Sequence, residues 1–420
     1  MQNSFEKIVL DNGLTIYTYV DSKKHSTIVN LVTKFGGSYN DFYVDGEHVH
    51  IEDGMAHFIE HLLYETGPYG NLLDYFGERQ MSSNALTGPN RTEYYFHAVE
   101  GLDDAIEVLL TSVNQACFTP HDIEKTKKAI YQEIRMGQDS KFQKLYNMTN
   151  QMLYHNISFQ SVLGTLKRME ELTYEETLLC YETFYQPQNQ VLFVMGNFDR
   201  DHIIQLVESI YSKFSFSKKE FQLFDYKEPI EVNQTSSSLF VPTNDTFVQV
   251  SFKLDLSLFT PHEKLDIDFM FSLFHNMNFG LTSSLYQELF DQNVIRDGID
   301  YNVRYCHSYC VFSVGAYIYG DNDELFVRKV LDTIENPVYN SEMFELHQNY
   351  DRMHLAIRPD SLENMMSPFV DNLFIFDYPH VDSIDDVDRR SLDLMKDLFG
   401  RLDFSHYCVA KLVSDENNKK

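Results

Sequence analysis

The chain is poor in cysteine, and it has no long apolar run. Its five cysteines are scattered, and no second Cys or His pair stands at zinc-finger spacing from Cys306 and Cys310. We therefore expect reduced thiols, as in a cytoplasm, and no disulfide framework. No apolar stretch reaches the ~20 residues that a membrane helix needs, and the first residues lack the basic-then-apolar pattern of a secretory signal. These absences predict a cytoplasmic protein without a membrane partner.

Basic residues are the second shortage, because 34 Lys and Arg stand against 63 Asp and Glu, for a formal net charge of −29. A nucleic-acid-binding protein needs a basic surface over the phosphates, so this balance argues against a nucleic-acid partner. The acidic residues are spread along the chain and do not form one tail. This distribution indicates a solvated acidic surface and no disordered acidic arm.

What the chain does have is length and apolar content, with 420 residues of which 43% are hydrophobic. This length exceeds what one ordinary core holds and predicts at least two domains. A polar and charged stretch at 215–232 is typical of a linker. We therefore predict an N-terminal domain over residues 1–214, the linker 215–232 and a C-terminal domain over residues 233–420.

Strand-like alternation and helical periodicity occur in both halves of the chain. The first half contains strands, a helix at 54–64, a hairpin, further helices and a buried strand at 190–195. The second half repeats this order faintly, with a strand at 246–253, an apolar helix at 265–277 and a closing strand at 407–413. Strands and helices do not alternate strictly, so the predicted fold class is α+β.

The segment from Gly54 to Tyr64 carries the residues with the clearest chemistry. Side chains three and four positions apart share one face of a helix, so His57, Glu60 and His61 are expected to project together. Two neutral imidazoles can hold a zinc ion, and a carboxylate beside them can take a proton from metal-bound water. The order His-x-x-Glu-His is a zinc-peptidase signature. Because the chain is rich in His and Glu, an amphipathic helix with two surface histidines is the alternative.

Glu133 and a second histidine pair stay open on the residues alone. Glu133 is expected near the buried edge of a helix that begins at Thr119. A carboxylate there needs a partner, which is either a metal or a Lys or Arg. His48 and His50 would share one face of a strand. The sequence offers no obvious third ligand beside them, which favours a polar surface role for this pair.

Taken together, the sequence resembles the pitrilysin/insulinase/mitochondrial processing peptidase family of inverted-motif zinc peptidases. The likeness covers most of residues 5–212 and, more weakly, residues 235–413. Its landmarks, in matching order and spacing, are Asp11-Asn-Gly-Leu14, Gly36-Gly37-Ser38, Gly54-Met-Ala-His-Phe-Ile-Glu-His61, Asn84-Ala-Leu-Thr87, Tyr94-Tyr-Phe96, Gln132-Glu-Ile-Arg135, Gly164-Thr165, Tyr185-Gln-Pro-Gln-Asn189 and Gly196-Asn-Phe-Asp199. The resemblance implies two similar α/β domains of the mitochondrial-processing-peptidase type, each a mostly antiparallel sheet packed by helices.

The resemblance also implies a metal site. One zinc ion per chain would be held by His57, His61 and Glu133. Glu60 would be the general base, and three protein ligands leave the fourth zinc position for water. The family tends to carry a second Glu about two helical turns before the third ligand. This chain has Thr126 there, so that outer support is missing or is supplied by Glu124.

The family adds its peptide substrate as a strand to a sheet edge, at the segment that matches Asn84 and Ala85 here. An ordinary Asn at a strand end is the alternative for Asn84. Active members also carry an Arg and a Tyr in the second domain, which reach the substrate near the zinc. The matching positions here are Phe290 and Asp297, and Tyr301 replaces the Tyr only if the loop is longer in this chain.

In two-subunit members of the family, one chain carries His-x-x-Glu-His and its partner carries the Arg and the Tyr. This chain is most similar to the catalytic subunit of the bacterial two-subunit type. We therefore predict a zinc metalloendopeptidase that cleaves peptides or small unfolded polypeptides in a chamber closed by a second family subunit or a second copy. The alternative is a non-catalytic or weakly catalytic scaffold subunit of a peptide or protein maturation complex.

Overall fold

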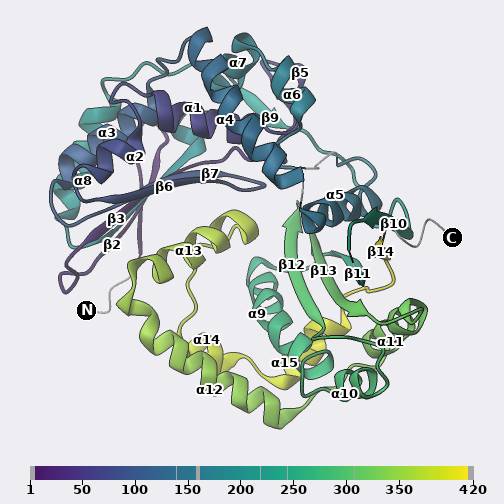
Figure 1. Cartoon of the computed structure of the whole chain (residues 1–420). Helices are drawn as coiled ribbons and strands as arrows, with labels where there is room; N and C mark the ends of the chain where they lie inside the picture. The colour runs from purple at the N-terminus through teal and green to yellow at the C-terminus, as the bar shows by residue number, and fades with distance from the viewer. Residues whose placement is uncertain are drawn as a thin grey trace. The chain divides into compact units, whose positions relative to one another are not determined.

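The computed structural model describes residues 5–138, 140–157, 161–217, 219–243, 245–306 and 308–414. The chain divides into two compact units, whose elements are labelled in Figure 1. Unit 1 comprises Met1–Gly137, Phe159–Asp225 and Ser361–Met366, and unit 2 comprises Gln138–Ser158, Tyr226–Asp360 and Ser367–Lys420. Each unit therefore includes short segments from the other half of the sequence, whereas the predicted domains 1–214 and 233–420 are contiguous. Within the described ranges, no helix is long and apolar enough to cross a membrane.

Unit 1 is built on a sheet in which central strands are fully buried. The strand order is β1 (Glu6–Val9), β2 (Thr15–Val20), β8 (Gln190–Gly196), β3 (Thr27–Thr33), β7 (Thr92–Ala98) and β6 (Ser82–Thr87). β2 runs parallel to β8, and the other neighbours pair antiparallel. Every residue of β3 and β8 is buried, as expected for apolar strands that are covered on both faces. The hairpin predicted after the motif helix is confirmed as β6 and β7.

The helices of unit 1 pack their apolar sides into one core with this sheet. They are α1 (Met55–Thr66), α2 (Leu72–Gly77), α3 (Leu102–Asn114), α4 (Pro120–Gln138), α6 (Leu166–Glu171), α7 (Tyr174–Phe184) and α8 (Arg200–Tyr211). α4 begins as predicted, because Asp122 accepts hydrogen bonds from the backbone N–H (2.8 Å) and the hydroxyl (2.7 Å) of Thr119. Ile59 of α1 and Ile130 of α4 are buried in the core, which leaves another side of each helix for chemistry.

A small second sheet of unit 1 has the order β5 (Glu47–His50), β4 (Asp41–Val44) and β9 (Phe221–Leu223). Phe42 of β4 and Phe221 of β9 contact Phe184 at the end of α7, with ring centroids 4.8 and 5.1 Å apart. Phe35 stacks on the same ring at 4.1 Å. β9 lies inside the segment 215–232, so part of the predicted linker forms a strand of unit 1.

Unit 2 repeats the strand order of unit 1. Its sheet runs β10 (Ser236–Val241), β14 (Tyr407–Ser414), β11 (Thr246–Asp255), β13 (Tyr309–Ile318) and β12 (Asp300–Cys306). This matches β2, β8, β3, β7 and β6, and β10 pairs parallel with β14 as β2 does with β8. The predicted fold is therefore confirmed as two similar, mostly antiparallel sheets packed by helices.

Helix α9 (Pro261–Asn278) takes the place in unit 2 that α1 has in unit 1, without the His-x-x-Glu-His sequence. The remaining helices of unit 2 are α5 (Lys141–Leu153), α10 (Ser284–Asp291), α11 (Asp323–Glu335), α12 (Ser341–Ile357), α14 (Ile384–Arg389) and α15 (Leu392–Gly400). α13 (Leu362–Phe376) belongs to unit 1 as far as Met366 and to unit 2 from Ser367. α5 belongs to unit 2, although the sequence places it in the predicted first domain. The five cysteines are free, and Cys117 is the exposed one.

Candidate metal centre

The start of α1 is fixed by a close backbone contact between two glycines. Gly54 precedes the helix with φ +100°, and Gly164 has φ +75°. A Cβ on Gly164 would lie 2.6 Å from the carbonyl oxygen of Asp53, so no side chain fits between the two segments. The carboxylate of Asp53 accepts a hydrogen bond from the backbone N–H of Ser161 (2.9 Å) and another from Asn40. This contact explains why glycines stand at both landmark positions.

Helix α1 presents the predicted motif residues on one side. His57 and Glu60 are each only 7% exposed, and His61 is half-buried. Apolar residues on the other sides of the helix, such as Phe58 and Leu62, are buried in the core of unit 1. The alternative of two surface histidines on an amphipathic helix does not describe this arrangement, since His57 is buried.

Glu133 of α4 reaches the two histidines. Its Oε2 lies 3.6 Å from Nε2 of His57 and 3.6 Å from Nε2 of His61. One ligand atom from each of the three residues lies within 4.8 Å of the other two. Two ligands of one tetrahedral zinc lie about 3.3–3.4 Å apart when each bond is about 2.0–2.1 Å long. Among the described residues no lysine or arginine pairs with Glu133, so the donor set fits a metal better than the alternative of a salt bridge.

The two motif histidines differ in how readily they take the neutral form that binds a metal. Burial, with a smaller contribution from His61, lowers the pKa of His57 to about 3, so its imidazole is neutral and able to coordinate. Burial acts to lower the pKa of His61 as well. The hydrogen bond to Glu65 and the charges of Glu60 and Glu133 outweigh it and raise the pKa of His61 above its ordinary value. Without a metal, the carboxylates around His61 favour its protonated, positively charged form. A bound cation would replace this proton, since a ligating imidazole is neutral.

Glu60 lies beside the cluster in a setting that suits a general base. Burial raises the pKa of its carboxyl group, and a hydrogen bond from Thr87 opposes this shift. The Thr87 hydroxyl donates to Oε2 of Glu60 at 2.6 Å. Thr87 ends strand β6, so this bond orients the carboxylate between α1 and the sheet edge. The sequence did not indicate Thr87, because nothing in its local pattern relates it to the helix.

Glu65 is a second residue that sequence reasoning missed. Its Oε1 lies 3.2 Å from Nδ1 of His61, and the hydrogen bond from His61 lowers the pKa of the Glu65 carboxyl group. Carboxylates that bind the second ring nitrogen of a metal-ligating histidine orient the ring and raise its basicity. The signal was available, since Glu65 stands four residues after His61 on one helix face.

Of the two expectations for the outer support, that it is missing at Thr126 or that Glu124 supplies it, the structure agrees with the first. Thr126 is fully buried, and its hydroxyl has no hydrogen-bond partner among the described residues. Glu124 is exposed and pairs with Lys127 at 2.7 Å. Nδ1 of His57 is likewise buried without a described partner. Within the described residues, the carboxylate that contacts an Nδ1 atom of these two histidines is therefore that of Glu65.

Replacing Glu65 by Ala is expected to weaken zinc binding about 10–100-fold, the range for loss of a carboxylate that orients a ligating histidine. Glu65→Gln keeps an acceptor for Nδ1 of His61 without the charge and is expected to fall between wild type and Glu65→Ala. Competition against a chromophoric zinc chelator at neutral pH measures the affinity. Glu124→Ala, which removes an exposed carboxylate of α4, is the matched control. Equal affinities for all four proteins would contradict the role of Glu65.

His57, His61 and Glu133 line a cavity of about 440 Å³, and residues of the edge strand β6 line it as well. Asn84 and Ala85 line it together with the histidines. β6 is last in its sheet order, so one of its edges has no strand neighbour within the described residues. Asn84 is exposed, and its side-chain oxygen accepts from the N–H of Ala85 at 2.9 Å. The hydroxyls of Tyr64 and Ser83 lie 2.8 Å apart and link α1 to this strand.

Two family models match the chain over most of its length. The model described as Insulinase (Peptidase family M16) matches residues 22–165, and the model described as Peptidase M16 inactive domain matches residues 171–342. The chain belongs to the insulinase family, peptidase family M16. His57, His61 and Glu133 lie within the first matched range, and α9 lies within the range of the inactive domain. The resemblance stated from the motifs is thereby confirmed.

Relatives of this M16 chain are named zinc proteases. The uncharacterized zinc protease YmfH of Bacillus subtilis is 28% identical over 298 residues, which cover 70% of this chain and 69% of that protein. Matches to uncharacterized zinc proteases of Rickettsia felis and Rickettsia bellii span about half the length of those relatives, 52% in each case. These names support a zinc-protease-like function at the level of the family.

Solved structures share the fold of this chain. A putative M16-like peptidase from Alicyclobacillus acidocaldarius has a TM-score of 0.85 at 24% identity, and the match covers 99% of each chain. The periplasmic protease PqqL from Escherichia coli has a TM-score of 0.78 at 14% identity. That match covers 100% of this chain and 49% of PqqL, so PqqL is about twice as long as the matched fold.

In unit 2 of this M16 chain, the positions expected to hold an Arg and a Tyr carry other chemistry. Phe290 lies exposed on α10, and Asp297 pairs with the neighbouring Arg296. Tyr301 lies on the edge strand β12, where its ring stacks on His275 with centroids 4.4 Å apart. None of these three side chains is described in contact with the residues of the candidate metal site.

Two other histidine groups have partners of their own. His48 and His50 each contact one oxygen of Asp41, at 3.0 and 2.9 Å. Asp41 lies on the facing strand β4, so the third polar residue that the sequence did not offer comes from cross-strand pairing. In unit 2, ligand atoms of His380, Asp382 and Asp386 also lie within 4.8 Å of one another. There Asp382 is held by two hydrogen bonds from the buried Arg390, which already neutralises its charge.

Proposed function

We propose that this chain is a zinc-dependent endopeptidase with one zinc ion per chain, held by His57, His61 and Glu133. One observation carries the proposal: two imidazoles and a carboxylate converge within 4.8 Å in a cavity that also holds the carboxylate of Glu60. Three ligands of this type leave a zinc coordination position open, as in catalytic and unlike structural zinc sites. The family and the zinc-protease names of the relatives agree with this chemistry.

The residues of the cavity divide the proposed reaction among them. Zinc, when bound, makes water acidic and polarises the carbonyl group of the scissile bond. Glu60 takes the proton of the attacking water and passes it to the leaving nitrogen. The raised pKa of Glu60 suits a group that must both accept and return a proton near neutral pH. Thr87 holds the carboxylate in place for both steps.

The substrate is proposed to bind as an extended peptide on the free edge of β6. Main-chain hydrogen bonds to an edge strand provide affinity with little dependence on the peptide sequence. Asn84 and Ala85 are the proposed contact residues, because they line the cavity beside the ligands. Such binding requires an extended chain, so peptides and small unfolded polypeptides are the expected substrates.

A second subunit is proposed to complete the peptide chamber. Phe290 and Asp297 cannot donate to a developing oxyanion as an Arg and a Tyr can. The 49% coverage of PqqL, a single chain of about twice the matched length, agrees with a chamber built from two such halves. The partner is either a family subunit that carries the Arg and the Tyr or a second copy of this chain, in the cytoplasm. The absence of the Arg and the Tyr, and of a Glu at the position of Thr126, also supports a second candidate function. In that candidate the chain is a scaffold subunit with little catalysis.

Removal of zinc tests the proposed function. A purified chain is expected to contain about one zinc ion, and dialysis against a chelator is expected to reduce peptide cleavage at least about a hundredfold, because the carbonyl is then no longer polarised. Added zinc should restore the activity. Metal content by mass spectrometry and cleavage of a fluorogenic peptide mixture are measured on the same samples. Absence of zinc from the purified chain, or equal cleavage with and without zinc, would refute the proposal that the chain is a zinc-dependent endopeptidase.

A further inference from the structure

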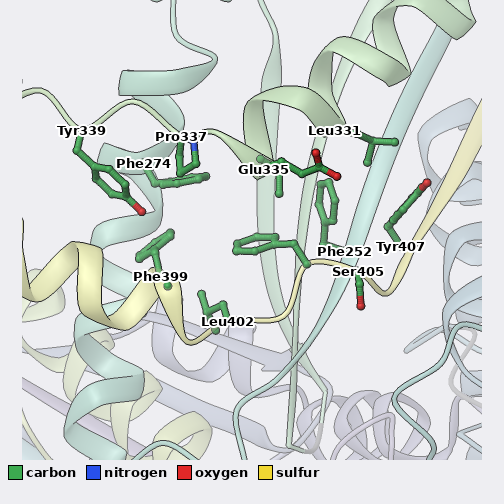
Figure 2. A pocket seen from close by; sticks show the side chains of 13 residues that line it. Phe252, Phe274, Leu331, Glu335, Pro337, Tyr339, Phe399, Leu402, Ser405 and Tyr407 are labelled. Atoms are coloured by element: carbon green, nitrogen blue, oxygen red, sulfur yellow. The ribbon is translucent and has the colours of Figure 1, made fainter.

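Unit 2 contains a second cavity, of about 490 Å³, which includes none of the metal-site residues. Its lining residues come from β11, α9, α11, the segment after α11, α15 and the chain from α15 to the start of β14. Figure 2 shows their side chains. Small-molecule sites typically have volumes of about 300–1,000 Å³. Its lining includes aromatic rings, from Phe252, Phe274, Tyr339, Phe399, Phe404 and Tyr407.

The internal repeat explains why this place is hollow. In unit 1, Phe184 near the end of α7 is covered by Phe35 and by the β5-β4-β9 sheet, through Phe42 and Phe221. α15 precedes β14 as α7 precedes β8, and it places Phe399 near its end. The chain passes from β11 to α9 without any counterpart of β4 and β5 in the described residues. Unit 2 therefore lacks the small sheet that covers this place in unit 1. The rings of Tyr339, Phe404 and Tyr407 stay half-buried at the cavity, whereas the other three aromatic rings are buried in the core.

Among the described residues that line the cavity, Glu335 is the one with a charged side chain. Glu335, the last residue of α11, lines it and is exposed. Its carboxylate makes no hydrogen bond or ion pair with another described residue. The C-terminal end of a helix adds a partial negative charge, and no Lys, Arg or His is among the described lining residues. In Figure 2 the side chains of Glu335 and Leu331 extend from α11 beside the aromatic rings.

We propose that this cavity binds an organic cation with an apolar body. The faces of aromatic rings attract cations, and a carboxylate beside them adds a charged hydrogen-bond acceptor. The apolar body would lie against the half-buried rings of Tyr339, Phe404 or Tyr407. The ammonium or guanidinium group would lie at Glu335. Such a group belongs either to a small free amine or to a basic residue next to an aromatic one in a peptide.

Three probes of similar shape test the charge preference: 2-phenylethylammonium, neutral 2-phenylethanol and anionic 3-phenylpropionate. Ligand-observed NMR titration of the full chain is expected to show one site that prefers the cation to the alcohol at least about tenfold, with no binding of the anion. A tenfold preference corresponds to about 1.4 kcal/mol. Equal binding of the three probes, or no binding of the cation, would overturn the proposal.

Two variants locate the site. Glu335→Gln is expected to weaken binding of the cation about tenfold, whereas Glu324→Gln, at the other end of α11, is expected to change nothing. Gly400→Leu is expected to abolish binding, since Gly400 lines the cavity and a Cβ there meets no atom within 4 Å. The open space at Gly400 lets this variant fold. An unchanged affinity in Glu335→Gln or Gly400→Leu would refute the assignment.

Capped dipeptides separate the two sources of the cation. N-acetyl-Lys-Phe-amide and N-acetyl-Glu-Phe-amide are tested as competitors of 2-phenylethylammonium in wild type. Their direct binding to wild type and to Gly400→Leu is measured by ligand-observed NMR. Tighter competition by the Lys peptide identifies a basic peptide segment as the ligand, and weaker competition identifies a free amine. Binding of the Lys peptide that persists in Gly400→Leu, or competition that the Glu peptide shares, would contradict the proposal. Zinc content plays no part in these measurements, so they are independent of the proposed peptidase.

Discussion

Replacing Glu60 by Gln is expected to reduce peptide cleavage about 10²–10⁴-fold, the range for loss of a general acid–base group, while zinc stays bound. Gln has nearly the same volume, and its amide oxygen can still accept the hydrogen bond that Thr87 donates to Glu60. It cannot take a proton from water. The metal ligands are left intact, so metal content and activity should separate. Initial cleavage rates and zinc content are measured on the same preparations.

His61→Ala provides the contrast to Glu60→Gln. It removes one of the three converging ligand atoms, so zinc and activity are expected to fall together. Glu124→Gln removes an exposed carboxylate that pairs with Lys127 and should leave both unchanged. Equal zinc in His61→Ala and Glu60→Gln would contradict the ligand assignment. Undiminished cleavage by Glu60→Gln would contradict its assignment as the base.

Helical periodicity was sufficient to bring His57, Glu60 and His61 together, because their spacing is local. Glu133 could be assigned only through the family resemblance, since its approach depends on how α4 packs in the core of unit 1. Thr87 was out of reach for the same reason: its hydrogen bond to Glu60 joins a strand end to a helix. The contact between Gly54 and Gly164 is also tertiary, although both glycines were landmarks.

The central strands and the motif helix were predictable because buried strands and amphipathic helices carry strong apolar patterns. β9 was missed since its strand geometry comes from pairing with β4 and spans only Phe221–Leu223. β12 was missed as well, and most of its residues are exposed or half-buried, which weakens the apolar alternation. α13 contains Pro368 inside the helix, a residue that local reasoning takes as a break.

The isolated chain at high dilution is expected to cleave peptides at least about 100-fold more slowly than the chain mixed with a second M16 subunit that carries the Arg and the Tyr. One missing donor to the developing oxyanion costs about 10²–10³ in rate. In this chain the matching positions are Phe290, an exposed apolar residue, and Asp297, which pairs with Arg296. Rates are measured across a dilution series, alone and with the partner from the same genome.

The dilution series distinguishes three arrangements of the proposed enzyme. Activity that falls with dilution and is restored by the second subunit indicates a heterodimer, because the missing donors arrive on another chain. Activity of the chain alone that rises steeply with its own concentration indicates a homodimer, in which Tyr301 or another residue of the second copy would have to act. Full activity at the lowest concentration would argue against a partner and leave the proposed zinc site in place, since His57, His61 and Glu133 all lie within unit 1.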